Sequence, residues 1–201
     1  VSDFHQYISR RGKTDENMLI RKIDSYLCDF YKSTNKALLV TGARQTGKSF
    51  SIRQFGKRNF RRFVEINFIE QPDAVSAFRN AKSSQDILVR LSLLTDVPLE
   101  KGQTLVFFDE VQECPEIVTA IKFLVDEGSY RYIMSGSLLG VELNDLRSEP
   151  VGYMDVKEMF PLDLEEFFMA LGVSKQVVDG LREAYDKREA VDEFVHNKMM
   201  D

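Results

Sequence analysis

Apolar residues in this chain fall into two patterns, short continuous runs and longer stretches that repeat every three to four positions. The runs predict buried strands at 37–40, 63–68, 104–110 and 130–136, and a fifth strand is expected at 151–160. The helical repeat predicts helices over about 15–31, from 47 to 56, from 84 to Pro98, from Pro115 onward and over 162–171. This alternation predicts an α/β fold, with a parallel sheet, right-handed crossovers and helices on both faces.

The loop after the first strand carries the most specific motif, Gly42-x-x-x-x-Gly47-Lys48-Ser49. Its glycines allow backbone N–H groups to turn inward around an anion, and the following helix directs its positive end at the same place. Lys48 can reach the β- and γ-phosphates, and Ser49 can bind a magnesium ion. The predicted nucleotide-binding residues are Gly42, Ala43, Arg44, Gln45, Thr46, Gly47, Lys48, Ser49 and Phe50. A chance glycine-rich turn is disfavoured, because the expected strand and helix flank the loop.

The run TLVFFDE at 104–110 ends in two carboxylates. Because ligands bind at the carboxyl ends of parallel strands, these acids are expected beside the phosphate loop. Asp109 is then placed to hold magnesium, usually through water, and Glu110 to orient and deprotonate the water that attacks the γ-phosphate. Without the upstream loop, a pair of solvated turn carboxylates would be the better interpretation.

The next strand ends at Ser135-Gly136-Ser137. A hydroxyl of Ser135 or Ser137 could sense the γ-phosphate or position the attacking water, and ordinary turn chemistry is an equally good interpretation. One strand is inserted between the phosphate-loop strand and the acidic strand. This order fits the branch of P-loop proteins that uses a catalytic glutamate.

Length and charge limit the remaining possibilities. With 201 residues the chain fits one domain, or one domain and the start of another, and its net charge of −5 argues against a surface covered in nucleic-acid-binding charge. A basic stretch contains Arg53, Lys57, Arg58, Arg61 and Arg62. A solvated helix end explains it better than a nucleic-acid contact, which stays an alternative.

Neither a bilayer-spanning apolar run nor a signal peptide is seen, so no membrane partner is expected and a cytoplasmic location is the default. Cys28 and Cys114 lack metal-ligand spacing and are interpreted as reduced thiols.

Four stretches, TGARQTGKS, TLVFFDEVQECP, YIMSGSLLGV and MFPLDLEEFF, together resemble a family of prokaryotic AAA-type ATPases. Its members join an N-terminal P-loop domain to a C-terminal nuclease-like domain of unsettled function. The resemblance implies a P-loop NTPase three-layer sandwich with a parallel five-stranded sheet in the order 5-1-4-3-2. It also implies that ATP and Mg²⁺ lie between the phosphate loop and the acidic strand, with Lys48, Ser49, Asp109, Glu110 and the 135–137 stretch in the roles given above.

Two features limit this transfer. The chain is expected to comprise an ATPase domain at 1–172 and the start of a helical region at 173–201, with the family's C-terminal domain missing. AAA-type enzymes commonly receive an arginine from a neighbouring subunit, and the corresponding loop here carries Arg147. Self-association would supply this arginine in trans, although Arg147 is as well explained as a surface residue.

The sequence therefore favours an ATPase whose turnover moves an attached domain or partner. A nucleotide-dependent switch with little turnover is a second possibility, and a small-molecule kinase a less favoured third. A GTPase is disfavoured, because Leu38 stands where the guanine-reading Asn-Lys-x-Asp pattern requires an acid after Asn35 and Lys36.

Overall fold

The computed structural model describes residues 19, 21–81, 83–137 and 152–193. These residues form two compact units. The sheet unit comprises the described residues within Ile23–Pro161, and the C-terminal unit those within Asp15–Lys22 and Leu162–Asp201.

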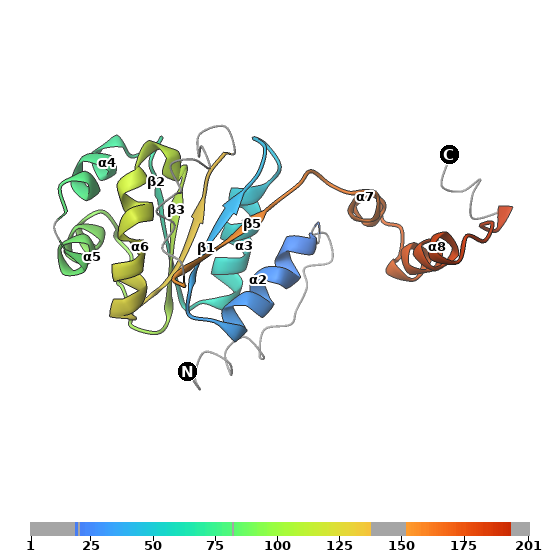
Figure 1. Ribbon diagram of the computed structural model, residues 1–201, viewed down its shortest axis with the longest axis horizontal. Helices are drawn as coiled ribbons and strands as arrows, with labels where there is room; N and C mark the ends of the chain where they lie inside the picture. The colour runs from blue at the N-terminus through green and yellow to red at the C-terminus, as the bar shows by residue number, and fades with distance from the viewer. Residues whose placement is uncertain (1–18, 20, 82, 138–151, 194–201) are drawn as a thin grey trace. The chain divides into compact units, whose positions relative to one another are not determined.

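Five parallel strands form the centre of the sheet unit (Figure 1). They are β1 (Ala37–Thr41), β2 (Arg62–Asn67), β3 (Thr104–Asp109), β4 (Arg131–Ser135) and β5 (Met154–Glu158). Their spatial order is β2-β3-β4-β1-β5, which is the predicted order 5-1-4-3-2 taken from the opposite edge. The predicted fold class is thus confirmed.

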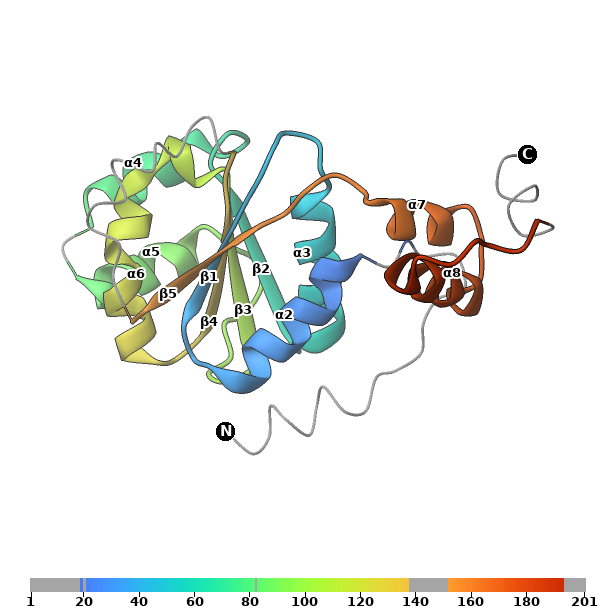
Figure 2. The ribbon, with the colours of Figure 1, turned by 45° about the vertical axis from the view of Figure 1, so that its right-hand side comes forward.

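Helices cover both faces of this sheet, which gives three layers (Figure 2). On one face lie α2 (Lys22–Ser33) and α3 (Lys48–Asn59). On the other lie α4 (Pro72–Arg79), α5 (Ser84–Leu93) and α6 (Pro115–Glu127), the last preceded by a short 3₁₀ turn, η1 (Val111–Glu113).

Alternating side chains of the buried strands build a separate core on each face. In β3, Phe108 packs among the α4–α6 residues, whereas its neighbour Phe107 packs among those of α2 and α3. Phe108 lies between two parallel rings, Phe68 at a centroid distance of 6.0 Å and Tyr132 at 6.4 Å. Every residue of β1 and β3 is buried, as continuous apolar runs predict for central strands of a parallel sheet.

Several boundaries differ from the predictions. Helix α3 continues past Gly56 to Asn59; the glycine is needed for packing, since a Cβ there would lie 2.2 Å from a ring carbon of Phe63. Helix α4 was not predicted, because its short span buries only Ala74 and Phe78. The first described helix begins at Lys22, and the earlier part of the predicted 15–31 helix lies largely outside the described residues.

The C-terminal unit contains α7 (Leu164–Ala170) and α8 (Lys175–Lys187). Asp163 and Glu166 form a reciprocal capping box at the start of α7. Ion pairs join the segments of this unit to one another: Arg21–Glu166, Lys22–Asp163, Lys22–Glu165 and Arg182–Glu165. A largely apolar cavity of about 930 Å³ lies within it, and Val178 is the only buried apolar side chain among the unit's described residues.

No described helix has the length and apolar character that a bilayer span requires.

Candidate nucleotide site

The phosphate loop connects the end of β1 to the start of α3, as predicted. Positive φ angles occur at Gly42 (140°), Gln45 (63°) and Gly47 (91°), so the loop folds back on itself between the strand and the helix. Gly47 is the N-cap of α3, and no side chain caps this helix end. The N–H groups of the first turn therefore direct the positive end of the helix dipole into the loop, where an anion would be stabilised.

Position 42 needs a glycine for two reasons, its positive φ angle and the lack of space for a side chain. A Cβ at this position would lie 2.1 Å from the carbonyl oxygen of Met159, directly after β5. The Met159 N–H donates to the Thr41 carbonyl at 2.8 Å. The beginning of the phosphate loop and the end of β5 are thus in direct backbone contact.

Lys48 lies within the turn of the loop. Its ammonium donates to the carbonyl oxygens of Ala43 at 2.7 Å and Gly42 at 3.2 Å. Burial lowers the pKa of Lys48, while the negative charges of Glu110 and Asp109 act in the opposite direction. An anion in the loop would give this buried ammonium a charged partner in place of neutral carbonyls.

The other predicted loop residues lie on its outer side or within its turn. Ala43, Arg44 and Gln45 are exposed, whereas Thr46 is buried and donates to the Ala43 carbonyl at 3.1 Å. Phe50, in the first turn of α3, is 52% exposed. Its large apolar surface is available to a ligand.

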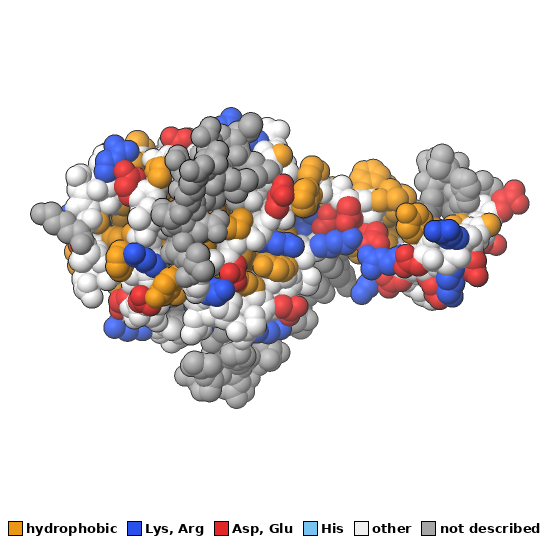
Figure 3. Space-filling view, viewed as in Figure 1, with side chains coloured by type: hydrophobic (Ala, Val, Ile, Leu, Met, Phe, Trp, Pro, Cys, Tyr) orange, Lys and Arg blue, Asp and Glu red, His pale blue; other side chains and the backbone are white. Residues whose placement is uncertain are grey.

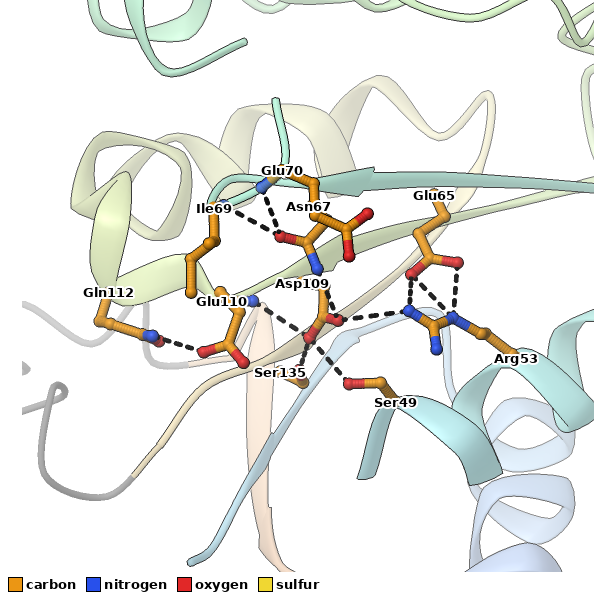
Figure 4. A network of polar contacts seen from close by, with 10 residues as sticks. All are labelled: Ser49, Arg53, Glu65, Asn67, Ile69, Glu70, Asp109, Glu110, Gln112 and Ser135. Atoms are coloured by element: carbon orange, nitrogen blue, oxygen red, sulfur yellow. Dashed lines mark hydrogen bonds and ion pairs between the residues drawn. The ribbon is translucent and has the colours of Figure 1, made fainter. Parts of the chain in front are cut away.

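Asp109 connects the phosphate loop to the acidic strand end (Figure 4). Its carboxylate is 2% exposed and accepts hydrogen bonds from Ser49 Oγ at 3.1 Å, the Glu110 N–H at 3.1 Å and Ser135 Oγ. Residues from β3, β4 and α3 therefore meet at one carboxylate. The structure brings together Ser49, Asp109 and Ser135, whose proposed roles stay predictions.

Glu110 leaves the strand in a left-handed conformation, with φ of 58°. Left-handed backbone is unfavourable for a residue with a Cβ, and such residues are concentrated at functional sites. The side-chain amide of Gln112 donates to the Glu110 carboxylate. Ser137 is buried, and Arg147 lies outside the described residues.

Three polar residues near Asp109 were not predicted as site residues. Asn67, at the end of β2, donates to Asp109 Oδ2 at 3.3 Å, and Arg53 lies 3.9 Å from the same oxygen while it binds Glu65. Asn67 could have been found from the sequence, because it ends a strand on the same side as the acids. The Arg53–Glu65 pair could not, since nothing in the basic stretch distinguishes Arg53.

Two further arginines of that basic stretch also have an acidic neighbour. Arg61 and Arg62 both pair with Glu100, at 3.3 Å and 2.7 Å. On the face shown in Figure 3, Lys and Arg side chains are interspersed with Asp and Glu. This arrangement supports the interpretation as a solvated helix end.

The oxygen atoms of Ser49 and Asp109 form a donor set that fits magnesium. A hard cation prefers hydroxyl and carboxylate oxygens, and Mg²⁺ usually takes one or two protein ligands together with substrate phosphates. In the described part of the chain, no group of three or more His, Cys, Asp or Glu residues could enclose a metal.

A parallel sheet in this order, with a phosphate loop after β1, defines the P-loop nucleoside triphosphatase fold. A sequence model of the AAA domain family matches residues 34–168, and the chain belongs to this family. A comparison with curated protein sequences gave no match.

Among solved structures, the chain is similar to the Walker-type ATPase PABY2304 of Pyrococcus abyssi, with a TM-score of 0.51, 17% identity and coverage of 96% of this chain. It is also similar to PCH-2 of C. elegans, with a TM-score of 0.49, 16% identity and 98% coverage. The chain spans 66% of the first protein's length and 54% of the second's. The first likeness supports the fold assignment.

Proposed function

We propose that this chain binds ATP with magnesium and hydrolyses it, and that turnover moves an attached domain or partner. The observation that carries the proposal is the 3.1 Å contact between Ser49 of the phosphate loop and Asp109 of the acidic strand. It supports a single site in which the phosphate-binding and metal-binding groups act together.

In this mechanism Lys48 and the N–H groups of the loop bind the β- and γ-phosphates. Ser49 and Asp109 would hold the magnesium ion, which neutralises charge on the phosphates when bound. Glu110 orients the attacking water and takes its proton, so that the broken bond leaves ADP and inorganic phosphate. Ser135 or Ser137 would position the γ-phosphate or this water.

A nucleotide-dependent switch with slow turnover is favoured by one observation. The Gln112 amide donates to one oxygen of the Glu110 carboxylate, so this base is already engaged by a protein group and has only its remaining acceptor sites for water. An arginine supplied in trans by self-association, with Arg147 as the candidate, would complete the site and accelerate turnover.

The proposal extends to the organisation of the chain. We place the ATPase domain at 1–172 and a helical C-terminal region at 173–201, in a cytoplasmic protein, although the compact sheet unit of the structure ends earlier, at Pro161. A nucleic-acid contact through the basic stretch has the least support, because three of its arginines pair with acids.

Phosphate release from Mg-ATP, measured over a range of protein concentrations, tests the proposal. Glu110→Gln should abolish release and keep ATP binding, whereas Lys48→Ala should weaken binding by at least about tenfold. The matched controls are Glu113→Gln, on an exposed acid of η1, and Lys57→Ala, on an exposed lysine of α3.

Each outcome has a distinct meaning. Release that rises faster than protein concentration indicates a self-assembling ATPase whose site is completed by a residue supplied in trans. ATP binding without release supports the switch. Unchanged ATP affinity in Lys48→Ala would refute the phosphate-loop assignment.

A further inference from the structure

Arg53 lies between two carboxylates of the candidate site (Figure 4). It comes from α3, four residues after Ser49, and its guanidinium binds Glu65 of β2 through Nε at 2.9 Å and Nη2 at 2.6 Å. The same Nη2 lies 3.9 Å from Asp109 Oδ2. Glu65 therefore fixes a permanent positive charge beside the buried carboxylate.

The surroundings of Asp109 differ between its two oxygens. Oδ1 accepts hydrogen bonds from neutral donors, Ser49, Ser135 and the Glu110 N–H. Oδ2 faces the Asn67 amide and the Arg53 charge. Among the described residues, Arg53 makes the only ion pair with Asp109. A cation that approaches this carboxylate therefore meets, in addition to the charges of Lys48 and Glu110, the positive charge of Arg53 and behind it the negative charge of Glu65.

We propose that the Arg53–Glu65 pair sets the magnesium affinity of this site, with Arg53 weakening it and Glu65 strengthening it. The inference rests on the proposed function, because it assigns Asp109 to the metal. The physical reason is that charges a few ångströms from a carboxylate that is 2% exposed interact with it more strongly than they would in bulk water, although solvent at the partly exposed Arg53 screens some of the effect.

An electrostatic role predicts opposite shifts for the two partners. Arg53→Gln removes the opposing charge, so the Mg²⁺ concentration that half-saturates ATP binding should fall by about tenfold. Glu65→Gln should raise it by a similar factor. The double variant has the same net charge as the wild type, so its half-saturating Mg²⁺ concentration should be close to the wild-type value. Arg53→Lys keeps the charge and should shift the value by less than about threefold.

A structural role predicts a different pattern. If the pair only held α3 against β2, removing either partner would loosen the same contact, and both single variants would weaken Mg²⁺ binding. Arg62→Gln is the matched control, because Arg62 makes a similar ion pair with Glu100 at the opposite end of β2. Side chains of Arg53 and Glu65 are 39% and 23% exposed, so the variants are expected to fold.

The experiment is a titration of MgCl₂ into the whole chain with a fluorescent ATP analogue, which reports binding without turnover. Opposite shifts in the two single variants, cancelled in the double variant, would support the inference. The inference would be overturned if ATP binding by the wild type depends on Mg²⁺ but the half-saturating Mg²⁺ concentration is unchanged in both single variants, or shifts in the same direction in both. The proposed function would then still stand. Absence of Mg²⁺ dependence in the wild type would overturn both.

Discussion

The two units of this chain are stabilised by different forces. In the sheet unit, two apolar clusters fill the space between the sheet and its helices, and the central strands are buried along their whole length. In the C-terminal unit, ion pairs hold the helices; the Arg21–Glu166 pair is buried, and the others join partly exposed side chains. The Lys22–Asp163 pair, for example, joins side chains that are 52% and 44% exposed.

This difference matters because the two forces differ in size and in their response to solvent. Burial of one large apolar side chain contributes about 1.5–3 kcal/mol, whereas an exposed ion pair contributes about 0–1 kcal/mol and weakens with salt. We therefore expect the sheet unit to tolerate acid and salt, and the C-terminal unit to respond to both. The candidate site is built entirely on the more strongly stabilised unit.

Phe108→Ala should produce the largest effect. Removing a ring that packs between Phe68 and Tyr132 leaves a cavity in the core, so the free energy of unfolding should fall by about 3–5 kcal/mol. Urea denaturation measures this change. The control is Phe167→Ala in α7, where the ring is 46% exposed and the loss should stay below about 1 kcal/mol. Equal losses would contradict the contrast between the units.

Gly42→Ala should cause the second largest loss of stability, because the added Cβ would be strained by the backbone angle and would clash with the Met159 carbonyl oxygen. We expect a loss at least about 2 kcal/mol larger than that of Gly102→Ala, together with weaker ATP binding. Gly102 also has a positive φ, of 71°, but a Cβ there would meet no atom within 4 Å. Thermal unfolding and ATP titration of both variants measure what the clash and the φ of 140° at Gly42 together cost beyond ordinary left-handed backbone. Similar losses in the two would refute the role of Met159.

Acidification should give the smallest effect and confine it to the C-terminal unit. Hydrogen bonds from Arg182 and Lys22 lower the pKa of Glu165. Although burial acts in the opposite direction, bonds from the Glu166 N–H and Lys22 lower the pKa of Asp163. A lowered carboxylate pKa contributes stability that is present above the unfolded value and is lost as pH falls through the folded one.

The helical chemical shifts of α7 should therefore diminish as pH falls below about 4, where these carboxylates begin to be protonated. Helix α6 is the internal control, since an apolar face holds it on the sheet. NMR spectra recorded at decreasing pH, with and without added salt, measure both helices. Simultaneous loss of α6 and α7 would show that the two units respond to acid as one.

The sequence was most informative where one local pattern determines the structure. Continuous apolar runs located the central strands, and the phosphate loop followed from two glycines between a strand and a helix. The strand order came from the family resemblance, and the structure confirmed it. The link between Ser49 and Asp109 was expected because parallel strands end at one edge of the sheet.

Features that depend on pairing between distant residues were missed. Arg53 looked like any other member of a basic stretch, and only the packing of α3 on β2 shows that it binds Glu65 beside Asp109. Gly56 looked like a helix end, but the ring of Phe63 requires it inside the helix. In both cases the local sequence is compatible with two outcomes, and a residue from another strand decides between them.

The contact between Gly42 and Met159 also has a mechanical consequence. Two backbones that touch without an intervening side chain have little freedom to slide, because neither can yield by changing rotamer. A displacement of the phosphate loop, such as one caused by a ligand, would therefore push directly on the end of β5 and on the chain that leaves it at Phe160. The close backbone contact at Gly42 thus transmits a displacement of the loop directly to the end of that strand.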